Sequence, residues 1–331
     1  MATYKGIRGF KVQTLAADPV ATAAWTTGGA LNTGRNNAAG MGTVTAAVAS
    51  GGASNPTGYT SNTEHYDGTA WSEETNMPSS TSYFGTAGSQ TAGLMFGGTP
   101  GVSSQCFKYD GSTWTSSGSL ATACKQGAGT GIQTAALYCG GEVPAVTTIT
   151  QIFDGSTWSS GGAMSQSRNN NAAFGTTTDA VTVGGAPSPG AQYNAETYNG
   201  TAWTVGNALN NGRQDLTKPG AGTASTAGMV ATGAGPPVPG TSNAAESYNG
   251  STWSVKSATL STARSGSYGT RSAVDSYLVT GGTPGYITST EIYSENSEPN
   301  SFLLEGDVWY NSTDYGLKFY DGTTTKTVTT S

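Results

Sequence analysis

The stretch Tyr109-Asp110-Gly111-Ser112-Thr113-Trp114 decides the fold, because close variants of it occur at five places along the chain. In each variant an aromatic residue precedes Asp-Gly or Asn-Gly, and a Trp follows three residues after the glycine. Asp-Gly or Asn-Gly between two apolar runs is a strong hairpin signal, because these residues tolerate the positive φ angles of a type I′ turn. The sequence therefore predicts five tight hairpins, at residues 66–71, 109–114, 153–158, 198–203 and 248–253.

The same signals belong to a longer repeat of about 45 residues. Six Trp residues recur along the chain: Trp25, Trp71, Trp114, Trp158, Trp203 and Trp253. After each Trp come a Leu or Met, an Arg in four units, a run of small residues, and an apolar strand. That strand ends in paired glycines: Gly51-Gly52, Gly97-Gly98, Gly140-Gly141, Gly184-Gly185 and Gly281-Gly282, with Gly233-Ala234-Gly235 in the fifth unit. A period near 45 with about four strands per unit is typical of a propeller blade.

The double glycine, the aromatic residue before the turn and the Trp after it resemble the kelch motif over residues 22–294, in six units. This resemblance implies an all-β, six-bladed, kelch-like β-propeller with a Trp on the outer strand of each blade. The repeat begins at Trp25 without a preceding strand, and it ends at Tyr293 without a following Trp. We therefore expect residues around 22–27 to close the sixth blade as its outer strand, which would remove the open edge of the ring.

Composition excludes several classes of protein. The chain has 331 residues, of which 49 are glycine, and only 10% of all its residues are charged. This composition excludes charge-driven disorder, collagen and coiled coils. A net charge of −6 argues against nucleic acid or an anionic membrane as partner. No apolar run approaches the ~20 residues of a membrane span, and no signal peptide is expected at the N-terminus.

The two ends of the chain do not fit the repeat, so we expect three parts. Residues 1–20 form a short N-terminal docking extension, residues 21–294 the propeller, and residues 295–331 a linker and a C-terminal β-hairpin module. The pattern of residues 5–19 is similar to the N-terminal segment of repeat proteins in tailed phages, and that of residues 306–320 resembles a short element of phage fibre and virion-surface proteins. A disordered terminus is the alternative for residues 1–20. The candidate docking residues are Tyr4, Ile7, Phe10, Trp309 and Tyr310.

The sequence offers little for catalysis. His65 is the only histidine, so neither a His/Cys metal cluster nor a copper site of the oxidase type is expected, and no nucleophile-elbow sequence is present. A glycosidase needs two carboxylates across a cleft, whereas the acidic residues here recur at equivalent repeat positions: Glu64, Glu196, Glu246 and Glu291. We therefore expect no enzymatic activity, no metal and no cofactor.

Binding through loops is the better prospect. The segments after the double glycines vary most between units, and they carry Tyr59, Tyr193 and Tyr286. The connections that contain an Arg should approach the same face near the central channel: Arg35, Arg168, Arg213 and Arg264. Tyr and Arg are favoured at recognition surfaces, so these seven residues are candidate ligand contacts. Loop packing for the tyrosines, and hydrogen bonding to neighbouring blades for the arginines, are the alternatives.

Together, the repeat and the resemblance of both ends predict a structural protein of a bacteriophage virion. We expect it on the tail fibre or capsid, at the virion surface after assembly in the host cytoplasm, binding a host-surface glycan or protein through its propeller loops. Expected partners are other virion proteins, the host glycan or protein, and further copies of the chain. Two alternatives remain open: a capsid decoration subunit that packs on its neighbours without binding a receptor, and a cellular kelch-type interaction module.

Overall fold

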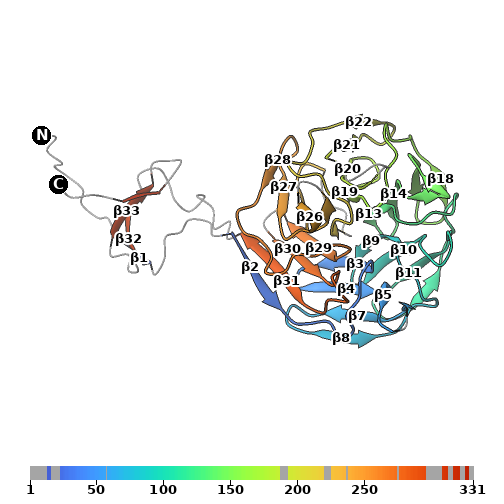
Figure 1. Ribbon diagram of the computed structural model, residues 1–331, viewed down its shortest axis with the longest axis horizontal. Coiled ribbons are helices and arrows are strands. Elements are labelled where there is room, and N and C mark those ends of the chain that lie inside the picture. The colour runs from blue at the N-terminus through green and yellow to red at the C-terminus, as the bar shows by residue number, and fades with distance from the viewer. Residues whose placement is uncertain are drawn as a thin grey trace, which may run out of the picture. The chain divides into compact units, whose positions relative to one another are not determined.

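The computed structural model describes residues 13–15, 23–56, 58–186, 193–219, 225–235, 238–273, 276–295, 308–311, 316–320 and 325–327. It confirms the predicted fold class, because this part of the chain is all-β and six small antiparallel sheets form the ring of a six-bladed β-propeller (Figure 1). None of the segments described is a helix with the length and apolar character needed to span a bilayer.

The first four blades each contain four strands, which we name A to D from the axis outward. Blade 1 consists of β3 (Ala39–Thr43), β4 (Ala46–Ser50), β7 (Thr63–Tyr66) and β8 (Trp71–Glu74). Blade 2 consists of β9 (Gly85–Ser89), β10 (Ala92–Phe96), β11 (Cys106–Tyr109) and β12 (Trp114–Ser116). Blade 3 consists of β13 (Ala128–Ile132), β14 (Ala135–Cys139), β17 (Thr150–Phe153) and β18 (Trp158–Ser160). Blade 4 consists of β19 (Ala172–Gly175), β20 (Ala180–Val183), β21 (Ala195–Tyr198) and β22 (Trp203–Val205).

The last two blades depart from this pattern. Strands B to D of blade 5 are β24 (Gly228–Ala231), β27 (Ala245–Tyr248) and β28 (Trp253–Val255), while β23 (Lys218–Pro219) pairs in parallel with strand A of blade 6. Blade 6 consists of β29 (Tyr268–Ala273), β30 (Ser276–Thr280), β31 (Thr290–Glu295) and β2 (Ala23–Gly28). The first propeller strand, β2, thus lies beside the last, β31, where the ring of Trp25 is 5.3 Å from that of Tyr293. Short hairpins lie on three B–C loops: β5 (Ala53–Ser54) with β6 (Gly58–Tyr59), β15 (Glu142–Val143) with β16 (Ala145–Val146), and β25 (Ala234–Gly235) with β26 (Val238–Thr241).

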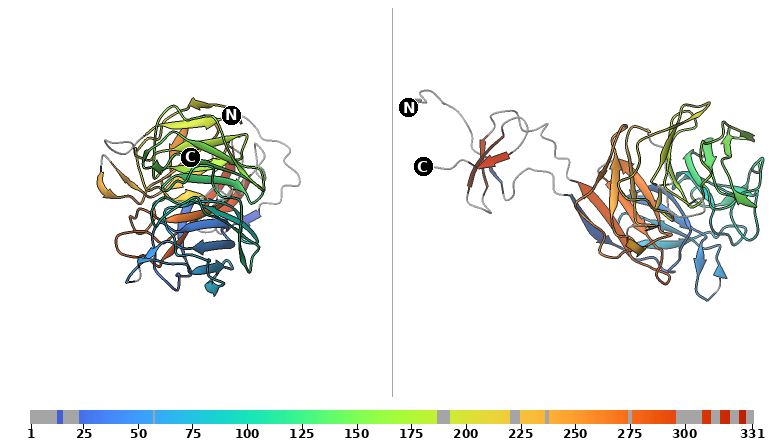
Figure 2. Two further views of the ribbon diagram at one scale, coloured as in Figure 1. Left: turned by 90° about the vertical axis from the view of Figure 1, so that its right-hand side faces the viewer. Right: turned by 45° about the horizontal axis from the view of Figure 1, so that its top comes forward.

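The order of the strands gives the ring two different faces. Because successive strands of a blade are antiparallel, the A–B and C–D turns lie on one face, which we call the AB face. The B–C loops and the D–A connections between blades lie on the opposite face, which we call the BC face. Figure 2 shows the ring from two further sides.

The inner strands approach their neighbours so closely that small residues are required. Strands A of adjacent blades contact one another around the axis. A Cβ atom added to Gly40 would lie 2.3 Å from the carbonyl oxygen of Gly269, and one added to Gly129 would lie 2.5 Å from the backbone nitrogen of Thr86. Backbone-to-backbone packing at the centre of the ring therefore explains these two inner-strand glycines.

The hairpins confirm the C–D pairing, but the prediction of type I′ turns is wrong. Tyr66 pairs directly with Trp71, so the loop has four residues, and only Gly68 among them has a positive φ, of 96°. The Asp67 carboxylate instead accepts hydrogen bonds from the backbone N–H groups of Thr69 and Ala70, at 2.7 and 2.8 Å. These hydrogen bonds lower the pKa of Asp67, and the one from Ala70 has the larger effect. The hydrogen bonds of the Asp67 side chain therefore stabilise this turn, and the φ preferences of the Asp-Gly dipeptide do not determine it.

The Trp residues join neighbouring blades. Trp71 Nε1 donates to Thr290 Oγ1 of the preceding blade at 2.9 Å, and Trp203 Nε1 donates to Thr150 Oγ1 at 2.8 Å. In blade 4 the position of this threonine is occupied by Ala195, and the buried Trp253 Nε1 of blade 5 has no hydrogen-bond partner. Trp253 therefore leaves a buried donor unsatisfied, which costs folding free energy.

A second unit contains strands from both ends of the chain. Its four-stranded sheet has the order β1 (Gln13–Leu15), β32 (Val308–Asn311), β33 (Gly316–Tyr320) and β34 (Thr325–Thr327). Strand β1 runs parallel to β32, with Gln13 opposite Trp309. The chain divides into this unit, Met1–Ala23 with Glu295–Ser331, and the propeller unit, Ala24–Ser294. The sequence patterns did not predict that the two ends share one sheet.

Replacing Ala195 with Thr should stabilise the propeller by about 1 kcal/mol, because the new hydroxyl can accept the free Trp253 N–H. Denaturant unfolding of the full chain measures this change. The matched control is Ala245→Thr, at the equivalent position of blade 5, because Trp25 Nε1 already donates to the Ala258 carbonyl at 3.2 Å. Equal effects of both substitutions, or a loss of stability in the first, would contradict the assignment.

Candidate functional site

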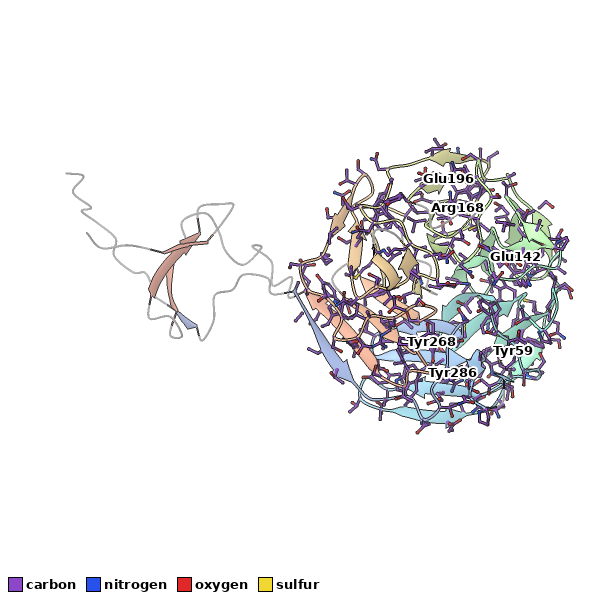
Figure 3. The ribbon with its side chains drawn as sticks, in the orientation of Figure 1. Tyr59, Glu142, Arg168, Glu196, Tyr268 and Tyr286 are labelled. Atoms are coloured by element: carbon purple, nitrogen blue, oxygen red, sulfur yellow. The ribbon has the colours of Figure 1, made fainter. Side chains whose placement is uncertain are left out.

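The three candidate tyrosines lie on the BC face, but not all in one place. Tyr59, Tyr193 and Tyr286 are 40%, 40% and 41% exposed, on the B–C loops of blades 1, 4 and 6. Blades 6 and 1 are neighbours, so Tyr286 and Tyr59 belong to adjacent loops, and Figure 3 shows them in the same part of the ring. Tyr193 belongs to a loop two blades away, and its ring packs against Gly212, where an added Cβ would be 2.7 Å from Cδ2.

The four candidate arginines are not on this surface. Each is fully buried or nearly so, and each pairs with the buried Glu of its own blade. Arg35 pairs with Glu64, and the N–O distances of the other pairs are 2.7, 2.7 and 2.5 Å for Arg168–Glu196, Arg213–Glu246 and Arg264–Glu291.

Blade 4 shows what this pair does (Figure 3). Arg168 Nη1 donates to the carbonyl oxygens of Gly184 at 3.1 Å and Asn194 at 2.9 Å, which lie at the two ends of the B–C loop. The Glu196 carboxylate accepts the backbone N–H of Ser165 at 2.7 Å. The ion pair thus fastens the D–A connection to strands B and C. We therefore assign the four arginines to the blade structure instead of to ligand contact, because an external ligand cannot reach them.

Blades 2 and 3 lack both members of the pair. Thr81 and Phe107 occupy the two positions in blade 2, and Cys124 and Gln151 occupy them in blade 3. Gln151 replaces the carboxylate with neutral hydrogen bonds, because its Oε1 accepts the Thr122 N–H at 2.8 Å and its Nε2 donates to the Thr122 carbonyl at 3.0 Å. No blade keeps one charge without the other, as expected when an unpaired buried charge is very costly.

The second residue after each Arg position forms a ring around the axis, which we call the axial ring. It consists of Asn37, Tyr83, Gln126, Asn170, Asp215 and Gly266. The backbone N–H of each donates to the carbonyl of the ring member in the preceding blade, at 2.6–3.1 Å, and the Asn37 N–H closes the cycle on Gly266. All six have positive φ angles, between 49° and 63°.

The five side chains of the axial ring are half-buried and lie on the BC face around the axis of the ring. Burial raises the pKa of Tyr83, with smaller contributions from Asp215 in the opposite blade and from Tyr59. Burial also raises the pKa of Asp215, although the charge of the nearby Lys218 opposes this shift. Gln126, in the amide orientation that satisfies both groups, donates to Glu142 at 2.7 Å. Sequence reasoning did not identify this ring.

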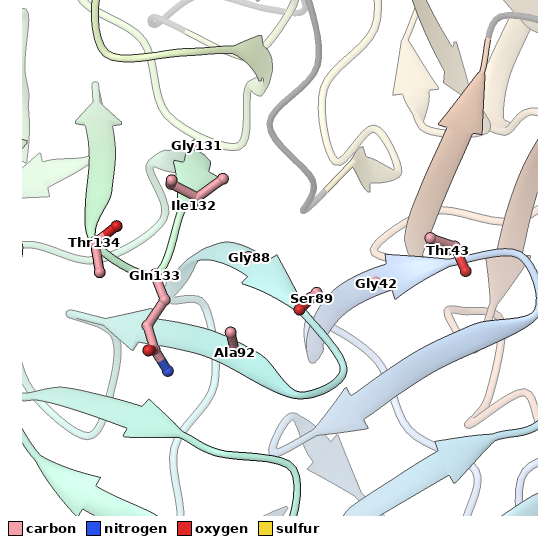
Figure 4. Close-up of a pocket in the computed structure, with 9 residues that line it drawn as sticks. All are labelled: Gly42, Thr43, Gly88, Ser89, Ala92, Gly131, Ile132, Gln133 and Thr134. Carbon is pink, nitrogen blue, oxygen red and sulfur yellow. The ribbon is translucent and has the colours of Figure 1, made fainter.

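Two cavities lie elsewhere on the ring. One, of about 310 Å³, lies on the AB face among the A–B turns of blades 1 to 3 (Figure 4). Its Gln133 amide is already committed to the carbonyl oxygens of Gly93 and Tyr109, at 3.0 and 2.7 Å. The other, of about 400 Å³, lies on the BC face of blade 2 and has an uncharged lining rich in hydroxyls: Ser79, Ser80, Thr99, Pro100, Val102, Ser103, Ser104 and Gln105.

His65 connects blades 1 and 2. Its Nε2 lies 2.9 Å from the Tyr109 hydroxyl, and its Nδ1 lies 3.8 Å from Glu74 Oε1. Burial lowers the pKa of His65, although Glu74 opposes this shift. Within the ranges described by the structure, no group of three or more His, Cys, Asp or Glu side chains is placed to hold a metal ion.

The candidate docking residues remain predictions. Tyr4, Ile7 and Phe10 lie outside the described residues. Trp309 and Tyr310 lie in β32, opposite Gln13 and Thr14 of β1, where the backbone alone is described.

Replacing Arg168 with Cys should destabilise the propeller by about 3–5 kcal/mol, because it leaves the buried Glu196 carboxylate unpaired. The double substitution Arg168→Cys with Glu196→Gln copies blade 3 and should cost much less. Denaturant unfolding of both variants tests this coupling. A double variant that is as unstable as the single one would refute it.

Stability should fall as the pH drops below 6.5, the ordinary pKa of His65, because its folded-state pKa is lowered and the unfolded chain then binds the proton more readily. Thermal unfolding between pH 7.5 and 5.5 measures this slope. His65→Gln should make it shallower, and an unchanged slope would exclude the histidine as its source.

No protein family model matches the chain, and no curated protein matches it.

Proposed function

We propose that the protein is a non-enzymatic binding protein of a bacteriophage virion, with a kelch-like propeller that recognises a host-surface glycan or protein through its BC face. The observation that carries the proposal is the path of the chain through blade 6. Strand β31 leaves the propeller as a C strand, and β2 enters it as a D strand. The end of a C strand and the start of a D strand both lie on the AB face.

The two connections to the rest of the chain therefore join the ring on the AB face. The BC face carries the B–C loops and neither connection. A face of the ring from which neither connection leaves can be presented to a partner. Variable loops on a rigid scaffold are the usual place for recognition.

The chemistry of the BC face favours a neutral, hydroxyl-bearing ligand. Tyr59 and Tyr286 offer exposed aromatic rings, on which the apolar face of a sugar can stack. The cavity of blade 2 adds serine and threonine hydroxyls and the Gln105 amide without any charge. These groups match a glycan better than a strongly charged partner.

The virion context rests on the resemblance of residues 5–19 and 306–320 to phage segments. The pairing of β1 with β32 supports it, because sequences from both ends contribute to one sheet that can act as a single attachment unit. Many copies on one particle would convert weak contacts into strong adhesion. A decoration subunit that uses the same sheet for attachment but binds no receptor is the second candidate.

The combined substitutions Tyr59→Ser and Tyr286→Ser should weaken binding to bacterial surface glycans at least tenfold, because they remove the two neighbouring aromatic contacts. An array of bacterial surface polysaccharides, probed with the full chain, provides the measurement. Ile132→Ser is the matched control, because Ile132 is 54% exposed on the AB face. Absence of binding to any glycan and to intact bacteria would favour the decoration subunit, and equal losses in both variants would exclude the BC face.

A further inference from the structure

The axial ring keeps large polar side chains where glycine would be the least costly residue. Five of its six members are not glycine, although all six have left-handed backbone conformations. Asn and Asp tolerate this conformation, whereas Tyr83 and Gln126 pay a larger cost. Blade 6 shows that glycine is compatible with the ring, because Gly266 makes the same backbone hydrogen bonds. The ring therefore does not need these side chains to close.

Three of these side chains have unused hydrogen-bonding groups. The Tyr83 hydroxyl, the Asn170 amide and the Asp215 carboxylate make no hydrogen bond with another residue that the structure describes, although all three residues are half-buried. None of these polar atoms is fully buried, so they remain open to solvent and to a ligand. Around the axis of the ring, such a set of unused donors and acceptors can accept a polar ligand.

The charges near the axis of the ring limit the kind of ligand that can bind there. Asp215 disfavours an anion. Lys218, whose Nζ donates across the channel to the Gly127 carbonyl at 3.0 Å, disfavours a cation. A carboxylate can accept two neighbouring hydroxyls, an amide can donate and accept, and Tyr83 can bond a hydroxyl or cover an apolar ring face. This combination fits a neutral pyranose.

We propose that the axial ring is a sugar-binding site, in which Asp215, Asn170 and Tyr83 hold one neutral pyranose unit on the BC face, at the axis of the ring. This inference rests on the proposed function and names the subsite that reads a single sugar residue. Gln126 and Asn37 are further members of the ring. The remainder of a glycan would extend over the neighbouring loops.

The test uses the full chain and a panel of neutral monosaccharides: glucose, galactose, mannose and their N-acetylamino derivatives. Protein-detected NMR of the side-chain amides should show saturable shifts at Asn37, Gln126 and Asn170. Asp215→Asn should weaken this binding at least tenfold. Asn170→Gly should weaken it as well while leaving the unfolding midpoint unchanged or higher, because glycine relaxes the backbone. If Asn170 had only a structural role, the substitution would lower the unfolding midpoint and leave sugar binding unchanged. Ser89→Ala, in the cavity on the AB face, should change nothing.

The outcomes separate this inference from the proposed function. Sugar binding that survives both axial-ring substitutions but is lost with Tyr59→Ser and Tyr286→Ser would overturn the axial site and leave the BC face as the binding surface. No saturable shift with any monosaccharide would also overturn the axial site, while the polysaccharide array decides the proposed function separately.

Discussion

One backbone hydrogen bond, repeated at every blade junction, holds the ring together. The second glycine of each pair, and Gly233 in the fifth unit, donates its N–H to the carbonyl oxygen at the Arg position of the next blade, at 2.8–2.9 Å, and the bond from Gly282 to Arg35 closes the circle. Such a donor needs an unusual backbone conformation, and the φ of Gly282 is 107°. A side chain there would collide, because a Cβ on the equivalent Gly52 would lie 2.7 Å from the Asn36 carbonyl oxygen. The second glycine of each pair is therefore a requirement of closure, whereas the first position can hold another residue, as Thr232 does in blade 5.

The same residue that accepts this bond also carries the buried guanidinium. Backbone closure and the Arg–Glu pair thus meet in one D–A connection, as at Arg168 and Glu196. The backbone bond persists where the side chains change, because Gly98 still donates to the Cys124 carbonyl at 2.9 Å. The backbone hydrogen bond is therefore common to every D–A connection, whereas the Arg–Glu ion pair is one of several side-chain arrangements that can accompany it. Blades can exchange a charged pair for a neutral one as long as both members change together.

The blades could be predicted from the sequence because the repeated residues are those that the blade geometry requires. These are the paired glycines at the junction, the small residues of the inner strands, and the Trp of the outer strand. Its signal for the Arg–Glu pair was also present, since Arg and Glu occur in the same four units. The turn type was mispredicted because the Asp67 side chain, and not the φ preference of the dipeptide, satisfies the backbone. The axial ring could not be predicted, because Tyr83 and Gln126 have no intrinsic preference for positive φ. Ring closure imposes that conformation on them.

This separation between scaffold and surface has a consequence for recognition. The axial ring is closed by main-chain groups, so its side chains contribute little to the hydrogen bonds that position them. Tyr83, Asn170 and Asp215 can therefore vary without loss of the fold, as Gly266 already demonstrates. The B–C loops have the same freedom, since their ends are fixed by the buried pair and their middle parts are not. A propeller of this kind can change its ligand at constant architecture, which is the property that a protein facing a changing partner surface requires.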